Sequence, residues 1–284
     1  MTADVLLATF QLLPDGEPGG ALLVEALAAR GVAARWAVWD DPAVDWAAAG
    51  LVAVRATWDY HRRCEEFLAW SRRVAATTTL LNGPDVFAWN ADKAYLVGLG
   101  ELVATLPTAL LEDAALVPGL GAAIERWGTV VVKPRTGAGG VGVVVADRTD
   151  DQRLEGLTPG PWVVQPLVES VRTTGESSLH VLDGGAVSQV DKVAVGEEVR
   201  VHGSYGGRSR LVPLDAERAA LAEQAVRAAA DLLGADLAYA RVDMMRHDGG
   251  WRVSELELIE PGLYLDVDPA NAERFADLVT GRLR

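Results

Sequence analysis

Cysteine, lysine and long apolar runs are scarce in this 284-residue chain, and each shortage excludes a class of protein. The single cysteine, Cys64, rules out an intramolecular disulfide and a cysteine-based metal cluster. No apolar run approaches the roughly 20 residues that a membrane span needs. The first residues lack the basic start and the small-residue cleavage site of a secretory signal. We therefore expect a globular, soluble, cytoplasmic protein.

Positive charge is also scarce. Forty Asp and Glu against 26 Lys and Arg give a net charge of -14, which disfavours nucleic acid and anionic membranes as partners and leaves a small-molecule substrate. Only three of the basic residues are lysines, namely Lys93, Lys133 and Lys192. Because arginine stands almost everywhere else, these lysines are candidates for positions that need a compact ammonium group. For Lys192, a surface position is the alternative.

Short apolar strands alternate with helical patterns at the start of the chain. The strands are expected at Val5–Thr9, Ala33–Trp39 and Leu51–Thr57, and a helix at Cys64–Ala75. This rhythm predicts a parallel, doubly wound sheet over residues 1–85, with ligands at the carboxyl ends of its strands.

Two charged residues, Arg55 and Asp59, stand where the third of these strands ends. An arginine and an aspartate that face one cavity can bind the carboxylate and the ammonium group of an amino acid. We therefore predict that they bind substrate, with an ordinary salt-bridged strand end as the alternative.

A glycine-rich hairpin occupies the middle of the chain. The strand Thr129–Lys133 leads into the glycine-rich residues 137–142 and returns as Val143–Ala146. No helix follows, so this is neither a P-loop nor a dinucleotide fingerprint. Glycines let backbone N–H groups approach a polyphosphate, and Lys133 would point at the same anion. A flexible turn is the alternative.

The strand Trp162–Gln165 is followed by a linker that can hold an adenine ring between apolar residues. An acid a few residues further on can accept hydrogen bonds from the ribose hydroxyls. Glu169 and Glu176 are both candidates, and either could be a surface carboxylate.

Acidic residues gather on a predicted C-terminal hairpin, Tyr239–Asp243 and Trp251–Ile259. Alternation places Glu255 and Glu257 on one face, with Asp243 level with them on the neighbouring strand. Three converging carboxylates repel one another unless a cation lies between them, and hard oxygen ligands suit Mg²⁺ shared with phosphate. A solvent-facing edge strand is the alternative.

These motifs, in this order, resemble the ATP-grasp superfamily. The details Arg55…Trp58-Asp59-Tyr60, Trp89-Asn90…Lys93 and Glu255–Leu265 resemble its glutathione-synthetase-like branch, which contains O-ureido-serine cyclo-ligase. The resemblance covers nearly the whole chain. It implies an α/β (α+β) ATP-grasp fold in which two α+β subdomains clasp ATP. The implied domains are a Rossmann-like domain at 1–85, a central subdomain with a glycine-rich flap at 86–165 and a C-terminal subdomain with the metal site at 166–284.

The resemblance also implies site residues. For ATP they are Lys93, Lys133, Gly137, Gly139, Gly140, Gln165, Leu167 and Glu176, with Glu169 the other candidate for the ribose. For one or two Mg²⁺ ions they are Asp243, Glu255 and Glu257. Relatives often have Asn in place of Glu257 and a turn one residue shorter before Pro261, so Glu260 is an alternative ligand.

For catalysis the resemblance implies Arg241, Arg200 and Lys133, because guanidinium and ammonium groups offset the charge of a transferring phosphoryl group. Arg208 is the second choice for Arg200. The turn Gly206-Gly207 would face the substrate, together with Arg55 and Asp59.

The implied activity is an ATP- and Mg-dependent carbon–nitrogen ligase that forms an acyl phosphate on a small amino-acid-like substrate, with intramolecular cyclisation as one form. The alternatives are a small-molecule kinase, an intermolecular dipeptide or amide ligase, and an ATP-binding protein without catalysis. The Ala/Leu-rich helix Ala219–Leu233 is expected to pack in the core or at a subunit contact, and we expect a homo-oligomer.

Overall fold

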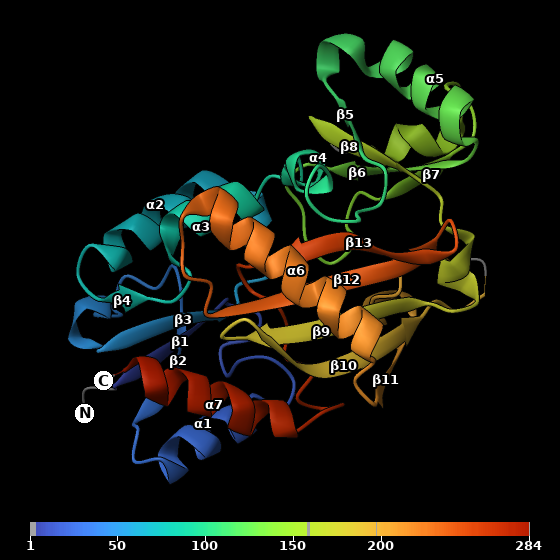
Figure 1. Cartoon of the computed structure of the whole chain (residues 1–284). Helices are drawn as coiled ribbons and strands as arrows, with labels where there is room; N and C mark the ends of the chain where they lie inside the picture. The colour runs from blue at the N-terminus through green and yellow to red at the C-terminus, as the bar shows by residue number, and fades with distance from the viewer. Residues whose placement is uncertain (1–3, 158–159, 197, 284) are drawn as a thin grey trace.

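The computed structural model describes residues 4–157, 160–196 and 198–283, which form three sheets in succession along the chain (Figure 1). The strands of the first sheet lie within residues 5–80, those of the second within 109–166 and those of the third within 176–257. None of the described helices combines the length and apolar character that crossing a bilayer would require.

The first sheet is parallel, with the strand order β2-β1-β3-β4, as predicted. Its strands are β1 (Val5–Thr9), β2 (Ala34–Val38), β3 (Leu51–Ala56) and β4 (Thr79–Leu80). The helices packed on it are α1 (Gly20–Ala29), α2 (Cys64–Ala75), α7 (Ala270–Arg282) and, through Phe87, α3 (Gly83–Asn90). Every residue of β1 and β3 is buried, because helices cover both faces of the sheet.

The second sheet is antiparallel and belongs to a lobe that projects from the molecule (Figure 1). Its elements are β5 (Ala109–Leu111), α5 (Leu116–Trp127), β6 (Val130–Pro134), β7 (Val144–Ala146) and β8 (Trp162–Pro166). The strand order is β5-β8-β6-β7. The β6–β7 pairing ends at Val132 and Val144, so the glycine-rich residues between them, the segment proposed as a flap, form a long open loop.

The third sheet is antiparallel, with the order β11-β10-β9-β12-β13. Its strands are β9 (Glu176–Leu182), β10 (Gly185–Val193), β11 (Arg208–Val212), β12 (Tyr239–His247) and β13 (Gly250–Glu257). Helix α6 (Ala216–Leu233) crosses one face of this sheet (Figure 1) and buries Ala222, Ala225 and Ala229 against it. That placement makes α6 a core helix and leaves the opposite face of the sheet for the site.

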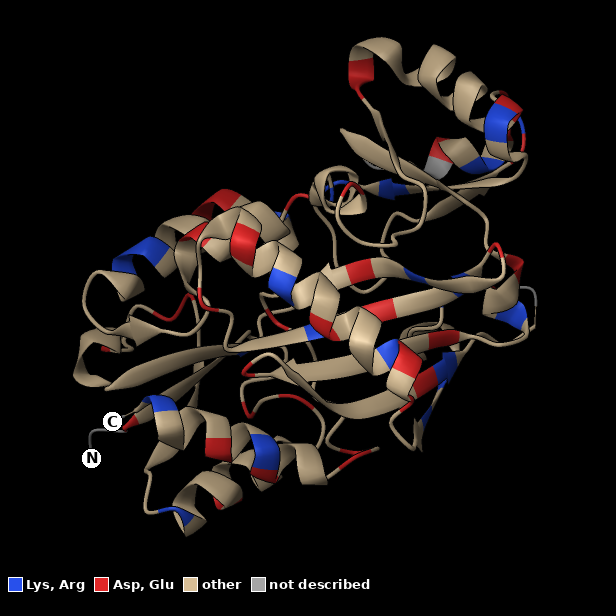
Figure 2. Cartoon of the chain, viewed as in Figure 1, with Lys and Arg blue, Asp and Glu red and all other residues tan. Residues whose placement is uncertain are grey.

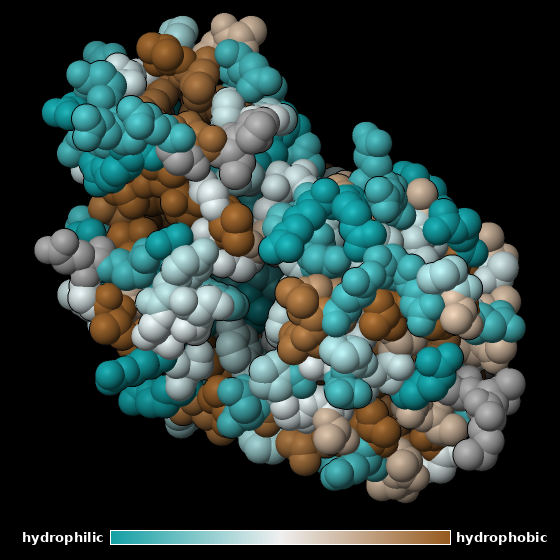
Figure 3. Space-filling model, turned by 180° about the vertical axis from the view of Figure 1, so that it is seen from behind, coloured by the Kyte–Doolittle hydropathy of each residue, from teal (hydrophilic) through white to brown (hydrophobic). Residues whose placement is uncertain are grey.

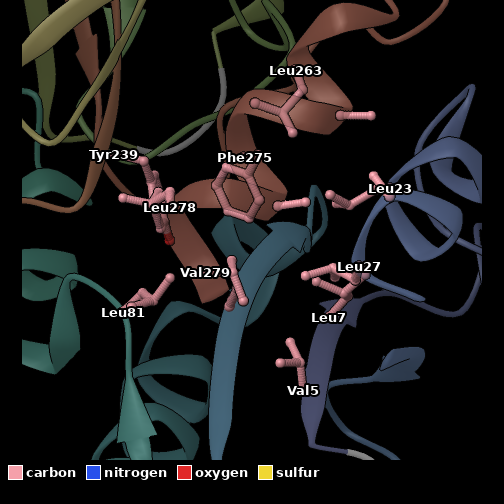
Figure 4. Close-up of a cluster of buried hydrophobic side chains, with 14 of the residues drawn as sticks. Val5, Leu7, Leu23, Leu27, Leu81, Tyr239, Leu263, Phe275, Leu278 and Val279 are labelled. Atoms are coloured by element: carbon pink, nitrogen blue, oxygen red, sulfur yellow. The ribbon is translucent and has the colours of Figure 1, made fainter. Parts of the chain in front are cut away.

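Two segments pack outside the domain in which the sequence placed them. Helix α7, near the end of the chain, returns to α1 and the first sheet, and Figure 4 shows Phe275 between Leu23 on one side and Leu278 and Tyr239 on the other. Helices α3 (Gly83–Asn90) and α4 (Tyr95–Gly100) contribute to the core of the third sheet. Both placements follow from the burial of apolar faces against elements that are distant in the sequence. A domain boundary drawn along the chain cannot describe such contacts.

Candidate active site

The β12–β13 hairpin carries the charged centre. Its register pairs Asp243 with Glu255 and Arg241 with Glu257, so the predicted alignment of the carboxylates is confirmed. The intervening Leu256 is buried in the core, while the side chains of Glu255 and Glu257 are each 27% exposed. Figure 2 shows both signs of charge on these two strands. The two glutamates therefore lie on the face of the sheet opposite to Leu256, and their side chains are partly buried although β13 is the edge strand, as the alternative expected.

Each of the three carboxylates contacts a cation of the protein itself. Arg241 donates to Asp243 through Nε (3.0 Å) and Nη2 (2.9 Å) and also to Glu257. The Lys93 ammonium lies 2.9 Å from Glu255. Burial alone would raise the pKa of Asp243, but Arg241 and Lys192 hold it well below its usual range. Burial raises the pKa of Glu257 to about 7 despite the opposing charge of Arg241.

The predicted convergence of three carboxylates on a shared metal ion needs correction. Among the described residues, no three His, Cys, Asp or Glu side chains are close enough to hold a metal by themselves. The reason is that Arg241 stands between Asp243 and Glu257. Mg²⁺ is usually held by one or two carboxylates and completes its shell with phosphate oxygens and water, so the donor set fits an ion that arrives with a nucleotide.

Glu260, the alternative ligand, lies at the edge of this centre. Its carboxyl group is buried, and burial, reinforced by the charge of Glu257, raises its pKa well above the usual value. Its backbone carbonyl accepts a hydrogen bond from Trp58 Nε1 (3.2 Å), which ties the turn to the first domain.

Lys192 belongs to the centre, although the sequence left it undecided. It is buried, 2.5 Å from Glu176 and 3.5 Å from Asp243. Burial would lower its pKa, but the two carboxylates raise it above the ordinary lysine value. The scarcity of lysine was the signal that pointed to it. Glu176 is thus buried beside Lys192 in the charged centre, whereas the Glu169 side chain is 72% exposed.

Lys133 differs from the other two lysines because it makes no ion pair with any described residue. It lies on β6, and burial lowers its pKa against the partly compensating charges of Glu255 and Glu176. Lys93 donates to the carbonyl of Gly137 (2.7 Å), so one lysine links the flap to the carboxylates. Gly139 and Gly140 have positive φ, which bends the flap. An ammonium that the nearby carboxylates only partly compensate, beside a glycine flap, suits a bound anion.

The flap meets the loop that carries Arg200. A Cβ atom at Gly140 would lie 3.3 Å from Arg200 Cδ and 3.4 Å from Tyr205, so a side chain there would crowd both. Arg200 is paired with Glu198 (2.6 Å) and lies over the Tyr205 ring. A cavity of about 770 Å³ is lined by Val144 and Val145 of β7 and by Gly196, Glu198 and Arg200. Seen from behind, the molecule is hollowed where the lobe meets the rest (Figure 3).

The predicted substrate turn is tightly packed. A Cβ at Gly207 would lie 1.9 Å from the Val201 carbonyl oxygen, and Gly206 has a φ of +83°. Both positions therefore require glycine for the turn itself. Arg208, which follows, is exposed on β11.

Comparison with known proteins agrees with this geometry. A family profile described as the N-terminal domain of the D-cycloserine synthetase DcsG matches residues 5–82. The cycloserine biosynthesis protein DcsG of Streptomyces lavendulae is 33% identical over 277 residues, covering 92% of this chain and 93% of that protein. The crystal structure of D-cycloserine synthetase DcsG matches with a TM-score of 0.87 and 31% identity over 99% of both chains. The chain belongs to the ATP-grasp ligase family.

A further solved structure shares the fold. The ATP-grasp ligase PsnB, complexed with a minimal precursor, Mg and ADP, matches with a TM-score of 0.63 and 18% identity over 99% of this chain and 98% of that one. The predicted ATP-grasp fold is confirmed, and the protein is an ATP-dependent ligase that forms ADP and phosphate.

Two predicted substrate contacts of this ligase do not face a cavity. Arg55 is completely buried, donates to the Pro261 carbonyl and lies 3.5 Å from Glu17. Asp59 accepts hydrogen bonds from Trp39 Nε1 (2.9 Å) and Arg63 (3.1 Å). The prediction that Arg55 and Asp59 face one cavity is wrong, because the packing of β3 against the end of the chain seals Arg55.

Gln165 is also enclosed. It is 1% exposed within the second sheet and donates its amide to Thr108 Oγ1 (2.9 Å), so it supports the sheet and does not lie on the wall of the cleft. Leu167 follows directly and is held by a hydrogen bond from its own N–H to the Thr129 carbonyl (2.9 Å). Of the two predicted adenine contacts, Leu167 is the one with an accessible side chain.

Proposed function

We propose that this ligase activates the carboxylate of a small amino-acid-like substrate as an acyl phosphate and then joins it to a nitrogen. When the nitrogen belongs to the same molecule, the product is a ring. The observation that carries the proposal is that Arg241 on β12 is already balanced by two carboxylates, while Lys133 on β6 makes no ion pair with any described residue. Such an arrangement suits the transfer of a phosphoryl group.

In the first step, a carboxylate oxygen of the substrate attacks the γ-phosphorus of ATP, and the bond to the bridging oxygen breaks so that ADP leaves with the electron pair. Lys133 and Lys93 would hold the phosphates beneath the flap, and Arg241 and Arg200 would offset the charge of the transferring group. The nitrogen then attacks the acyl carbon, phosphate leaves, and the nitrogen loses a proton.

Asp243 and Glu255 would hold one or two Mg²⁺ ions, with Glu257 or Glu260 completing the set, and the ions would neutralise phosphate charge. Glu176 would accept from the ribose, and Leu167 would pack against the adenine. Closure of the Gly137, Gly139 and Gly140 flap would exclude water, which would otherwise hydrolyse the acyl phosphate.

The name of the relative DcsG favours cyclisation as the reaction. DcsG is named a D-cycloserine synthetase, and its similarity to this chain extends through all three sheets. The intermolecular form, which makes a dipeptide or amide, requires a second amine as substrate.

The test is ADP release with amino acids, ureido-amino acids and dipeptides, followed by mass analysis of the products. One substrate consumed per ADP, with loss of water from the product, supports cyclisation. An absolute requirement for a second amine replaces cyclisation with intermolecular ligation. A product that retains phosphate replaces the ligase proposal with a kinase.

A further inference from the structure

Tyr264 holds a backbone conformation that bulky residues rarely adopt. Its φ is +53°, and the other described non-glycine residues with positive φ are Asn82, Asp183 and Asp248. Asparagine and aspartate tolerate this region in turns, whereas a tyrosine there is an outlier. Such outliers persist where the surrounding structure enforces them, and they cluster at functional sites.

The neighbours of Tyr264 explain how the conformation is enforced. Leu263 and Leu265 are both buried in the core of the first domain, where Figure 4 shows Leu263 among the helices. The Leu263 N–H donates to Glu17 (2.7 Å), and the Tyr264 carbonyl accepts from the Asp268 N–H (2.7 Å). Both leucines are anchored in the core, and the tyrosine between them lies toward the charged centre.

The Tyr264 ring lies beside the cations of the active site. Its centre is 5.4 Å from the guanidinium carbon of Arg241 and 5.9 Å from the Lys192 ammonium. His180 makes an edge contact with it at 5.9 Å. The side chain is partly exposed, and its hydroxyl makes no hydrogen bond to any described residue. Both cations are themselves paired with carboxylates, Arg241 with Asp243 and Glu257 and Lys192 with Glu176 and Asp243, so the hydroxyl is a donor that the charged centre leaves available to a ligand.

We propose that the Tyr264 hydroxyl donates a hydrogen bond to the substrate carboxylate that becomes phosphorylated. This inference rests on the proposed function, because it assigns one contact of the same substrate. With Leu263 and Leu265 fixed in the core, the backbone conformation of Tyr264 places its ring beside Arg241 and Lys192. Tyr264 thereby determines which end of an amino-acid-like molecule meets the γ-phosphate.

The experiment compares Tyr264→Phe with the wild type, using the panel substrate that the wild type turns over. The variant keeps the ring and the strain and loses only the donor. We expect the KM for the carboxylate substrate to rise about tenfold, the size of one hydrogen bond to a charged group, with the KM for ATP unchanged. The same substrate, added without ATP, should raise the Tm of the wild type and not that of the variant. Unchanged KM and an unchanged Tm response would overturn the inference.

A matched pair of variants separates the loss of the Tyr264 side chain from the relief of backbone strain. Tyr264→Gly and Asp248→Gly each remove a positive-φ residue, the second at the distant β12–β13 turn. We expect both to keep or raise the Tm, while only Tyr264→Gly loses turnover. If Tyr264→Gly unfolds, Tyr264→Asn tolerates the same φ and supplies the measurement; full turnover in either folded variant overturns the inference. A wild type that releases no ADP with any carboxylate contradicts the proposed function instead.

Discussion

Two buried arginines stand on strands of different sheets, and each is paired with carboxylate. Arg55 on β3 is fully enclosed: its guanidinium carbon lies 4.5 Å from the centre of the Phe275 ring, and it donates to the Pro261 carbonyl. Arg241 on β12 is 8% exposed and bridges Asp243 and Glu257 on the face that borders the cleft.

The comparison shows how one residue type serves structure in one region and chemistry in the other. Arg55 joins β3 to the turn before α7, so its charge holds two distant segments together and is out of reach of a ligand. Arg241 is surrounded by further charged groups that an incoming phosphate can rearrange. The side chains that the fold places around each arginine determine its role, more than the strand that carries it or the acids that it pairs with.

The largest expected effect concerns the carboxylates of the centre that contains Arg241. Glu255→Gln or Asp243→Asn should lower the rate of ADP release by about 10³-fold, since the ligands for the phosphate-bound ion are lost. Glu255→Gln should also lower the Tm, because it leaves the buried Lys93 without its carboxylate. The measurement is turnover against Mg²⁺ concentration. An unchanged Mg²⁺ dependence in both variants would contradict the metal assignment, and the exposed Glu217→Gln serves as control.

The next effect tests the Arg55 side. Arg55→Met should cost about 3–5 kcal/mol of unfolding free energy, because Glu17 is left buried without its partner. The double variant with Glu17→Gln should recover part of this loss. Denaturant unfolding measures both, and the surface-exposed pair of Arg148 and Asp150 supplies a control in which Arg148→Met costs less than about 1 kcal/mol. If Arg55→Met folds normally and only the substrate KM rises, then Arg55 binds substrate after all.

A smaller effect concerns the unpaired cation of the cleft. Lys133→Ala should weaken ATP binding about 100-fold while the fold is kept, since one charge-assisted contact to phosphate is lost. Lys133→Arg should also be impaired, because a planar guanidinium does not replace a compact ammonium. Calorimetric titration with ATP measures both. Wild-type affinity in Lys133→Arg would show that this position needs only a positive charge.

The smallest effect lies between the two arginines, at His180. Burial lowers the pKa of its imidazole to about 4, and the charges of Arg241 and Arg55 contribute. The unfolded state therefore binds more protons between pH 4 and 6.5, so stability is fully present above pH 6.5 and falls as the pH drops. Between pH 7 and 5.5 the loss should be about 1 kcal/mol. His180→Gln should remove this part of the pH dependence of unfolding, and an identical profile in wild type and variant would show that the pKa of His180 is the same in the folded and unfolded states.

Much of the local structure follows from the sequence alone. The strand Val5–Thr9 and the helix Cys64–Ala75 match β1 and α2 residue for residue, because apolar periodicity and turn residues act over a few positions. The alternation of Glu255 with Leu256 likewise predicts which side of β13 faces the core. The ordered motifs, together with the scarcity of lysine, point to an ATP-grasp site.

Other features were decided only by the tertiary structure. Arg55 and Gln165 looked like ligand contacts, and segments distant in the sequence enclosed both. The sequence left the role of Lys192 open. The pairing of β9 with β10 and β12 places it beside Glu176 and Asp243. Periodicity specifies which face of an element is apolar, because that is a property of neighbours along the chain. The partners of a charged side chain depend on how those elements pack, so burial and charge compensation appear only when the chain is folded.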